Sequence, residues 1–188
     1  ARLAAAVANQ GCAGVIATVG LGRFEDHPGA QYVRINGAGL RDEIRRARTM
    51  TSGVLGVNVM VALTDYANLA RVAAAEDVDL IISGAGLPLD LPSFVQDMPI
   101  KLVPIISSAR ALTVICRKWQ RTYGRVPDAV VVEGVKAGGH LGFSFEEAAA
   151  GTAPDLDSIL VEVVAVANTY DPPIPVIAAG GIFDGKDI

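Results

Sequence analysis

The sequence has 188 residues, of which 51% are hydrophobic and 19% charged, and its formal net charge is −4 at pH 7. This composition predicts a globular chain with enough apolar material for a substantial core, and one domain over residues 1–188 is the default expectation. The 16 basic residues look scattered along the chain, which argues against a nucleic-acid partner.

The sequence indicates neither a metal site nor a membrane span. Cys12 and Cys116 lie far apart and lack the spacing of a zinc site or a disulfide framework, so a reducing cytoplasm fits best. The longest apolar stretch, residues 102–116, is interrupted by proline, serine and arginine and is not expected to cross a membrane.

Short apolar runs alternate with longer amphipathic ones along the sequence. The runs predicted to be strands are residues 14–19, 54–60, 80–83, 102–106, 129–132 and 175–179. The segments predicted to be helical are residues 1–10, 40–50, 65–75, 92–97, 109–123 and 156–168. A polar loop that includes His27 and Gly37 and a long loop through Pro154 are also expected. Because the sequence opens inside a helix and closes in a loop, we expect it to be truncated at both ends.

The strands are uniformly apolar, which predicts a parallel sheet covered on both faces by helices. An open doubly wound sheet and a (β/α)8 barrel both satisfy this pattern. Six βα units of about 30 residues match the spacing of a barrel of about 250 residues, and polar or glycine residues follow the strand ends, where barrels place their sites. We therefore predict an α/β fold, an incomplete (β/α)8 TIM barrel in which strands two to seven are visible and the first and last are absent.

Four motifs carry a resemblance to a known family. The segments VLGVNVM, LIISGAG, VVVEGVKAGGHLG and IPVIAAGGIFDG occur in this order over essentially the whole chain. They resemble the nitronate monooxygenase family, formerly called 2-nitropropane dioxygenases, which is related to the FabK-type enoyl-acyl-carrier-protein reductases. The resemblance implies a flavin-dependent oxidoreductase that binds FMN in a TIM barrel.

The resemblance also implies roles for individual residues. His140 would be catalytic, and the cofactor-binding residues would be Asn58 at the flavin ring, Glu133, Gly138 and Gly139 lining the FMN site, and Gly180 and Gly181 at the phosphate. The last role has independent chemistry, because a glycine turn after a late barrel strand can form an amide-lined phosphate cup. No metal ligand is implied.

Most of these residues also have an ordinary structural explanation. A lone histidine in a loop is usually a surface residue, the glycine pairs could be simple turns, and Asn58 could hydrogen-bond a neighbouring strand end. Lys136, just before the glycine pair, could attract an anionic phosphate or substrate. Trp119 and Tyr123 lie four apart on a helix, which indicates packing or an oligomer surface such as that of a homodimer.

Three functions remain open. The first is oxidation of alkyl nitronates with molecular oxygen, in which His140 takes a proton from an acidic carbon. The second is an enoyl-thioester reductase that uses NAD(P)H; the resemblance implies Glu at position 133 more often in that branch and Gln in the monooxygenases. The third is a non-catalytic flavin- or phosphate-binding barrel.

Overall fold

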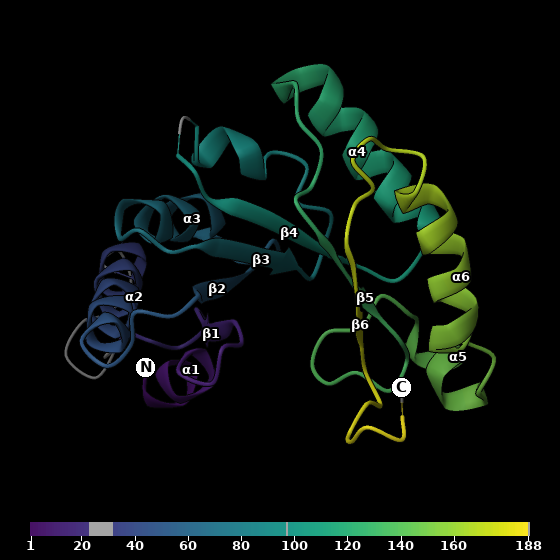
Figure 1. Ribbon diagram of the computed structural model, residues 1–188, viewed down its shortest axis with the longest axis horizontal. Helices are drawn as coiled ribbons and strands as arrows, with labels where there is room; N and C mark the ends of the chain where they lie inside the picture. The colour runs from purple at the N-terminus through teal and green to yellow at the C-terminus, as the bar shows by residue number, and fades with distance from the viewer. Residues whose placement is uncertain (23–31, 97, 188) are drawn as a thin grey trace. The chain divides into compact units, whose positions relative to one another are not determined.

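Strands and helices alternate along the described chain, which comprises residues 1–22, 32–96 and 98–187 of this computed structural model (Figure 1). The strands are β1 (Gly14–Ala17), β2 (Leu55–Met60), β3 (Leu80–Gly84), β4 (Lys101–Ile106), β5 (Val130–Glu133) and β6 (Val176–Ala179). All six predicted strands are confirmed, and the largest shift is at β1, which ends at Ala17 rather than at residue 19. His27, expected in a solvated loop, lies outside the described residues.

The helices are α1 (Arg2–Ala8), α2 (Tyr32–Arg48), α3 (Tyr66–Ala75), the short 3-10 helix η2 (Leu91–Phe94), α4 (Ala109–Tyr123), α5 (Phe145–Ala150) and α6 (Leu156–Ala167). The bounds of α4 are those predicted. Ser108 Oγ accepts a hydrogen bond from the Ala111 N–H at its start, and Gly124 ends it in the left-handed conformation that glycine favours.

Helix α2 begins earlier than the sequence indicated. A loop was expected through Gly37, but Asn36 and Gly37 lie inside the helix and are buried. A Cβ atom on Gly37 would lie 3.0 Å from Asn68 Nδ2 of α3. The glycine is therefore a position where α2 approaches α3 closely, and not a sign of a loop.

Helix α5 was not predicted, because the segment through Pro154 was expected to be a loop. It begins with a capping box in which Ser144 Oγ accepts from the Glu147 N–H and the Glu147 carboxylate accepts from the Ser144 N–H. Gly151 ends it with φ of 65°. None of its residues is buried, so local capping rather than core packing explains this helix.

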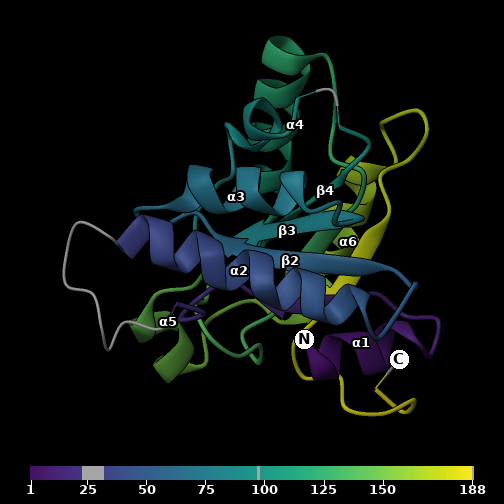
Figure 2. The same ribbon diagram turned by 90° about the vertical axis from the view of Figure 1, so that its left-hand side faces the viewer.

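The chain divides into two compact units. Unit 1 comprises Ala1–Gly86 and Asp90–Leu102, and unit 2 comprises Leu87–Leu89 and Val103–Ile188. In unit 1, β1, β2 and β3 are parallel neighbours in chain order, with Ala17 opposite Asn58 and Asn58 opposite Ile82. Figure 2 shows α2 and α3 lying over this sheet. The apolar residues of β1, β2 and β3 that are buried are Ile16, Leu55, Val57, Val59 and Ile81.

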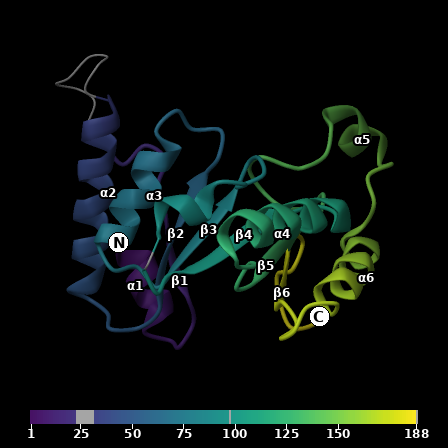
Figure 3. The same ribbon diagram turned by 90° about the horizontal axis from the view of Figure 1, so that it is seen from above.

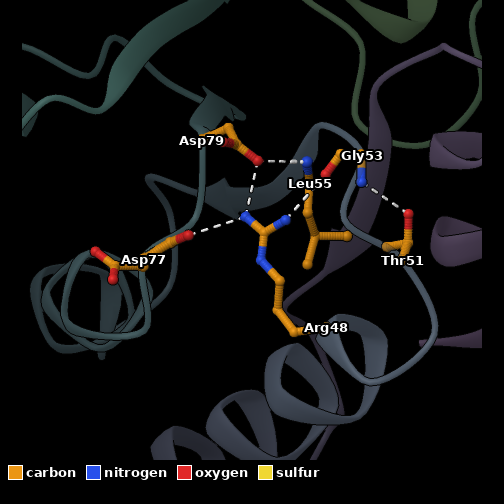
Figure 4. Close-up of polar contacts among 6 residues, drawn as sticks. All are labelled: Arg48, Thr51, Gly53, Leu55, Asp77 and Asp79. Carbon is orange, nitrogen blue, oxygen red and sulfur yellow. Dashed lines mark hydrogen bonds and ion pairs between the residues drawn. The ribbon is translucent and has the colours of Figure 1, made fainter.

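Arg48, the last residue of α2, ties together the two loops that precede β2 and β3 (Figure 4). Its guanidinium donates to the carbonyls of Gly53 and Asp77, both at 2.9 Å, and to the Asp79 carboxylate at 2.7 Å. The Leu55 N–H donates to the same carboxylate oxygen. Burial raises the pKa of the Asp79 carboxyl, but these donors outweigh it and leave the pKa below its ordinary value.

In unit 2, the part of β4 from Val103 onward, β5 and β6 are also parallel and in chain order, with Ile105 opposite Val131 and Val131 opposite Ile177. Trp119 of α4 is fully buried, and its Nε1–H donates to the Pro88 carbonyl at 3.0 Å. Trp119 is therefore a packing residue. Figure 3 shows α5 set apart from β5 and β6 within this unit.

Both units repeat a strand, a helical connection and a parallel neighbouring strand, which is the repeat of a (β/α)8 barrel. None of the helices within residues 1–22, 32–96 and 98–187 combines the length and the apolar character needed to cross a membrane.

Candidate functional site

In unit 2, the loops that follow β5 and β6 lie against each other at the carboxyl ends of the strands. The Gly134 N–H donates to the Ala179 carbonyl at 3.0 Å, so the two chains leave the sheet side by side. The Ala137 N–H then donates to the Gly134 carbonyl at 3.0 Å, which closes a tight turn after β5. Lys136 lies within this turn, between Gly134 and Ala137.

The backbone conformation requires glycine at positions 180 and 181. Their φ angles are +100° and +81°, a region that residues with a side chain rarely adopt. A Cβ on Gly180 would lie 2.7 Å from the Ala137 nitrogen, and one on Gly181 would lie 2.9 Å from Lys136 Cδ. The N–H groups of Gly180, Gly181 and Ile182 donate to no other residue in the described part of the chain.

These glycines line a pocket of about 250 Å³. Its lining residues are Gly134, Val135, Lys136, Asp155, Leu156, Asp157, Gly180, Gly181, Ile182 and Asp187. The pocket thus combines free backbone donors and one lysine with three aspartates. Two of the carboxylates already accept backbone hydrogen bonds: Asp155 from the Ser158 N–H, and Asp187 from the N–H groups of Phe183 and Asp184.

The three aspartates of this pocket were not predicted. Asp187 closes the loop after β6, and its bonds with Phe183 and Asp184 lower the pKa of its carboxyl. The FDGKDI segment, read only as a loop from the sequence, carries the aspartate and glycine turn chemistry that could have indicated this closure. Asp155 is the N-cap of α6, a role that its position before an apolar helix could have indicated.

Gly138, Gly139 and His140 lie on an exposed part of the loop after β5. Gly139 has φ of +87°, and a Cβ on either glycine would meet no atom within 4 Å. The loop returns to the sheet at Gly142, where a Cβ would collide with the Ser107 side chain at the end of β4. His140 therefore lies between Gly138–Gly139, where a Cβ would meet no atom, and Gly142, which packs against Ser107. His140 itself is exposed to solvent.

Glu133, the last residue of β5, lies opposite Ala179 and on the same face of the sheet as Val131 and Ile177. It is half-buried, and burial raises the pKa of its carboxyl. The side chain forms no hydrogen bond to the residues that the structure describes. It can therefore offer a hydrogen bond or take up a proton more readily than an exposed glutamate.

Asn58 lies in unit 1, in the middle of β2. Its backbone carbonyl accepts hydrogen bonds from Thr18 N–H at 3.1 Å and Thr18 Oγ1 at 2.9 Å. Its side-chain amide is half-buried and bonds to none of the described side chains or backbone groups. The hydrogen bonds from Thr18, at the end of β1, thus use the backbone carbonyl of Asn58 and leave its side-chain amide available.

Unit 2 brings together Gly180 and Gly181 with the Lys136 turn, and the ends of β5 and β6 bring Glu133 beside Ala179. His140, Gly138 and Gly139 belong to the same loop but do not line the pocket. Thr18 was not predicted, and no spacing in the sequence distinguishes it from other strand-end threonines.

Comparison with known proteins supplies relatives over the whole length of this chain. A FabK structure from Thermotoga maritima is similar with a TM-score of 0.71 and 28% identity, covering 98% of this chain and 48% of that chain. A nitroalkane oxidase structure from Streptomyces ansochromogenes shares the fold, with a TM-score of 0.74 at 23% identity over 99% of this chain and 56% of that one. These likenesses confirm an α/β fold of the incomplete (β/α)8 barrel type.

Two curated relatives carry the name (3aS,4S,5R,7aS)-5-hydroxy-7a-methyl-1-oxo-octahydro-1H-indene-4-carboxyl-CoA dehydrogenase. The relative from Mycobacterium tuberculosis is 27% identical over 190 residues, and the one from Rhodococcus jostii is 25% identical over 187. This chain is covered completely in both comparisons but spans only 44% and 43% of those proteins.

The family is shown by a family model that matches the whole chain. The family model described as nitronate monooxygenase matches residues 1–188. The predicted family is therefore confirmed: this chain belongs to the nitronate monooxygenase family.

Proposed function

We propose that this chain supplies the cofactor-binding part of an FMN-dependent nitronate monooxygenase, which oxidises alkyl nitronates with molecular oxygen. The observation that carries the proposal is the family match over all of residues 1–188. The geometry in unit 2 supports it, because the loops after β5 and β6 form a glycine-lined pocket at the carboxyl ends of the strands.

The glycine and lysine part of this pocket suits the phosphate group of FMN, whereas the carboxylates of Asp155, Asp157 and Asp187 oppose it. Asp155 and Asp187 already accept backbone hydrogen bonds, which offsets part of their charge. Gly180, Gly181 and Ile182 have N–H groups that bond to no described residue, and Lys136 adds a positive charge. A Cβ on Gly180 would collide with Ala137, and one on Gly181 with the Lys136 side chain, so glycine at both positions keeps this backbone close to the Lys136 turn. The pocket volume of about 250 Å³ suits the phosphate end of the cofactor, and in this proposal the ring system lies outside it.

When bound, FMN supplies the electron transfer, and the protein supplies orientation and proton handling. The Asn58 amide is free to hydrogen-bond the ring of the cofactor. Glu133, with its raised pKa, can hold a proton at the edge of the sheet. His140 in its neutral form can take the proton from the acidic carbon of a nitroalkane, which prepares the nitronate.

A second candidate is an FMN-dependent oxidoreductase of thioesters, such as an enoyl-acyl-carrier-protein reductase that uses NAD(P)H. Two observations favour it: Glu133 stands where the reductase branch often carries glutamate, and relatives at 25–28% identity are named FabK and a carboxyl-CoA dehydrogenase. A flavin- or phosphate-binding barrel without turnover is the third.

Anaerobic reduction of the FMN-loaded protein separates these functions. An alkyl nitronate is expected to bleach the flavin absorbance near its long-wavelength maximum, whereas NADH and NADPH leave it unchanged with or without an enoyl thioester. Bleaching by a pyridine nucleotide followed by reoxidation with the thioester would replace the first function by the second. Bound flavin that no donor reduces would favour the third.

A further inference from the structure

His140 lies in a long loop that makes few contacts with the rest of unit 2. This segment, residues 138–153, is the His140 loop. Every hydrogen bond that its residues make within the described part of the chain joins two residues of the loop itself. Helix α5 belongs to the loop, has no buried residue and lies apart from β5 and β6 (Figure 3). Hydrogen bonds to the sheet therefore do not fix the position of His140.

Burial is uneven along the first half of the His140 loop. Residues 138–140 and 144–147 are exposed, whereas Leu141 and Phe143 are half-buried. Gly142 lies between these two side chains. This pattern indicates that the loop meets the rest of the unit at residues 141–143, directly after His140.

The residue that Gly142 approaches is Ser107, directly after β4. A Cβ on Gly142 would lie 1.9 Å from Ser107 Oγ and 2.9 Å from Ser107 Cβ. Rotation of the Ser107 side chain would move its hydroxyl but not its Cβ, whose position the backbone sets. The φ angle of Gly142 lies outside the positive region, so the close approach, and not the backbone conformation, requires glycine there.

Ser107 itself is held on both sides. Ile106 lies opposite Val132 in the parallel pair of β4 and β5. On the other side, Ser108 Oγ accepts a hydrogen bond of 3.3 Å from the Ala111 N–H at the start of α4. A strand end and a helix start thus fix the position of the one residue between them. Ser107 is therefore a rigid support for the His140 loop.

We propose that Ser107 and Gly142 are positioning residues that hold His140 in place for proton transfer. Gly142 follows His140 by two residues, so the contact of its backbone with Ser107 limits how far the imidazole can move. On the other side of His140, an added Cβ on Gly138 or Gly139 would meet no atom within 4 Å, so these residues do not restrict the loop. The inference rests on the proposed function, in which His140 takes a proton from an acidic carbon. Geometry matters for that step, because a misplacement of about 1 Å can cost about 100-fold in rate.

Substitutions at the two positions, alone and together, isolate this contact. Gly142→Ala places a methyl group against the Ser107 side chain and displaces the loop. Ser107→Gly removes the support and lets the loop move. Ser107→Gly/Gly142→Ala removes both atoms with which the new methyl group collides, so that group takes the place of the serine side chain. The double variant should therefore behave more like the wild type than either single variant does.

Backbone order parameters from ¹⁵N relaxation measure how firmly the loop is held, without any assay of activity. For the amides of residues 141–143 they should be about 0.8 in the wild type, fall below about 0.6 in both single variants and recover in the double variant. The amide chemical shifts of β5 should stay constant in all four proteins, which shows that the sheet is intact.

The kinetic effect should be confined to proton transfer. In the FMN-loaded Gly142→Ala variant, kcat/KM for a neutral nitroalkane should fall by about tenfold or more and recover to within about threefold of the wild type in the double variant. Oxidation of the preformed nitronate should change by less than about threefold, because that substrate needs no deprotonation. A merely structural contact would lower both reactions equally.

Gly185→Ala is the matched control, because a Cβ there meets no atom within 4 Å, and it should behave like the wild type in every measurement. Unchanged order parameters in Gly142→Ala, or a double variant no better than the worse single variant, would overturn the proposal. Equal losses on the nitroalkane and the nitronate would overturn the positioning role. A wild type that does not react with nitronates would contradict the proposed function alone, since the order parameters still test the contact between Ser107 and Gly142.

Discussion

At the scale of single residues, the two glycine pairs of the candidate site are constrained differently. Gly180 and Gly181 combine positive φ with close approach to Ala137 and Lys136, so the fold itself requires them. Gly138 and Gly139 face open space, and only Gly139 has positive φ. A ligand that approaches the backbone would explain Gly138, whereas no described neighbour does.

Replacement of Gly181 by valine tests the phosphate cup. The new Cβ would displace Lys136 and force an L residue to φ of +81°, so we expect FMN retention to fall at least about tenfold while the barrel stays folded. FMN affinity measured by flavin fluorescence quenching, with circular dichroism as the folding check, gives the result. Gly185→Ala is the control, because a Cβ there meets no atom within 4 Å. Equal flavin affinity in both variants would place the phosphate elsewhere.

Replacement of His140 by alanine tests the proton-transfer role. Flavin absorbance should be retained, and kcat/KM for a neutral nitroalkane should fall by about 100-fold or more, the usual size of a general-base contribution. A preformed nitronate needs no deprotonation, so its oxidation should change far less. Stopped-flow reduction with both substrates compares them directly. Equal losses on both substrates would show that His140 binds substrate rather than moving a proton, and no loss on either would make it a surface residue.

At the scale of elements, the starts of β2 and β3 are held by one pair of charged residues, Arg48 and Asp79. Asp79→Asn is expected to lower the free energy of unfolding at neutral pH by about 1 kcal/mol, because its half-exposed carboxylate accepts from Arg48 and Leu55. The folded-state pKa of Asp79 is depressed. Its contribution is therefore present above the ordinary pKa, near 3.8, and is lost as pH falls through the folded value. Urea denaturation at neutral pH and below pH 4 should show the variant and the wild type converging in acid; a constant difference would contradict the assignment.

Helix α5 depends on its capping box. Ser144→Ala removes the side-chain acceptor for the Glu147 N–H and should destabilise the helix locally by about 1 kcal/mol. Because no residue of α5 is buried, global stability should not change. Hydrogen exchange should speed up at residues 145–150 and stay constant in β5. Faster thermal unfolding or a lower global stability would mean that α5 is coupled to the core.

The elements could be predicted from the sequence where local chemistry decided them. The apolar runs located every strand, and the helix predicted over residues 109–123 matches α4, which Gly124 ends. Prediction failed where a distant neighbour decided the structure: Gly37 signalled a loop, but its contact with α3 belongs to the tertiary fold. The Ser144–Glu147 capping box of α5 could have been recognised in the sequence, although it lies in a glycine-rich segment that was predicted to be a loop.

The candidate site was predicted only in outline. Strand-end positions indicated where Glu133, Gly180 and Gly181 would gather, because parallel strands end at one edge. The clash that makes Gly180 obligatory involves Ala137, which lies 43 residues away in sequence (180 − 137) and carries no visible signal. The turn around Asp187 and the N-cap role of Asp155 could have been recognised in the sequence, but their gathering with Asp157 around one pocket could not.

At the scale of the whole molecule, the candidate residues are distributed over two units. Asn58 belongs to unit 1, and Glu133, His140 and the glycine pairs belong to unit 2. The chain spans less than half the length of the curated relatives it matches. Unit 2 contains the predicted phosphate end of the site, so binding of the phosphate group can be tested on this chain directly.

Comparison of FMN with riboflavin by isothermal titration calorimetry tests this central claim, because the two ligands differ only in the phosphate. We predict that FMN binds at least about tenfold more tightly than riboflavin, which corresponds to about 1.4 kcal/mol, and that Lys136→Met reduces this preference. Equal affinities for FMN and riboflavin, with no effect of Lys136→Met, would contradict a phosphate site between β5 and β6.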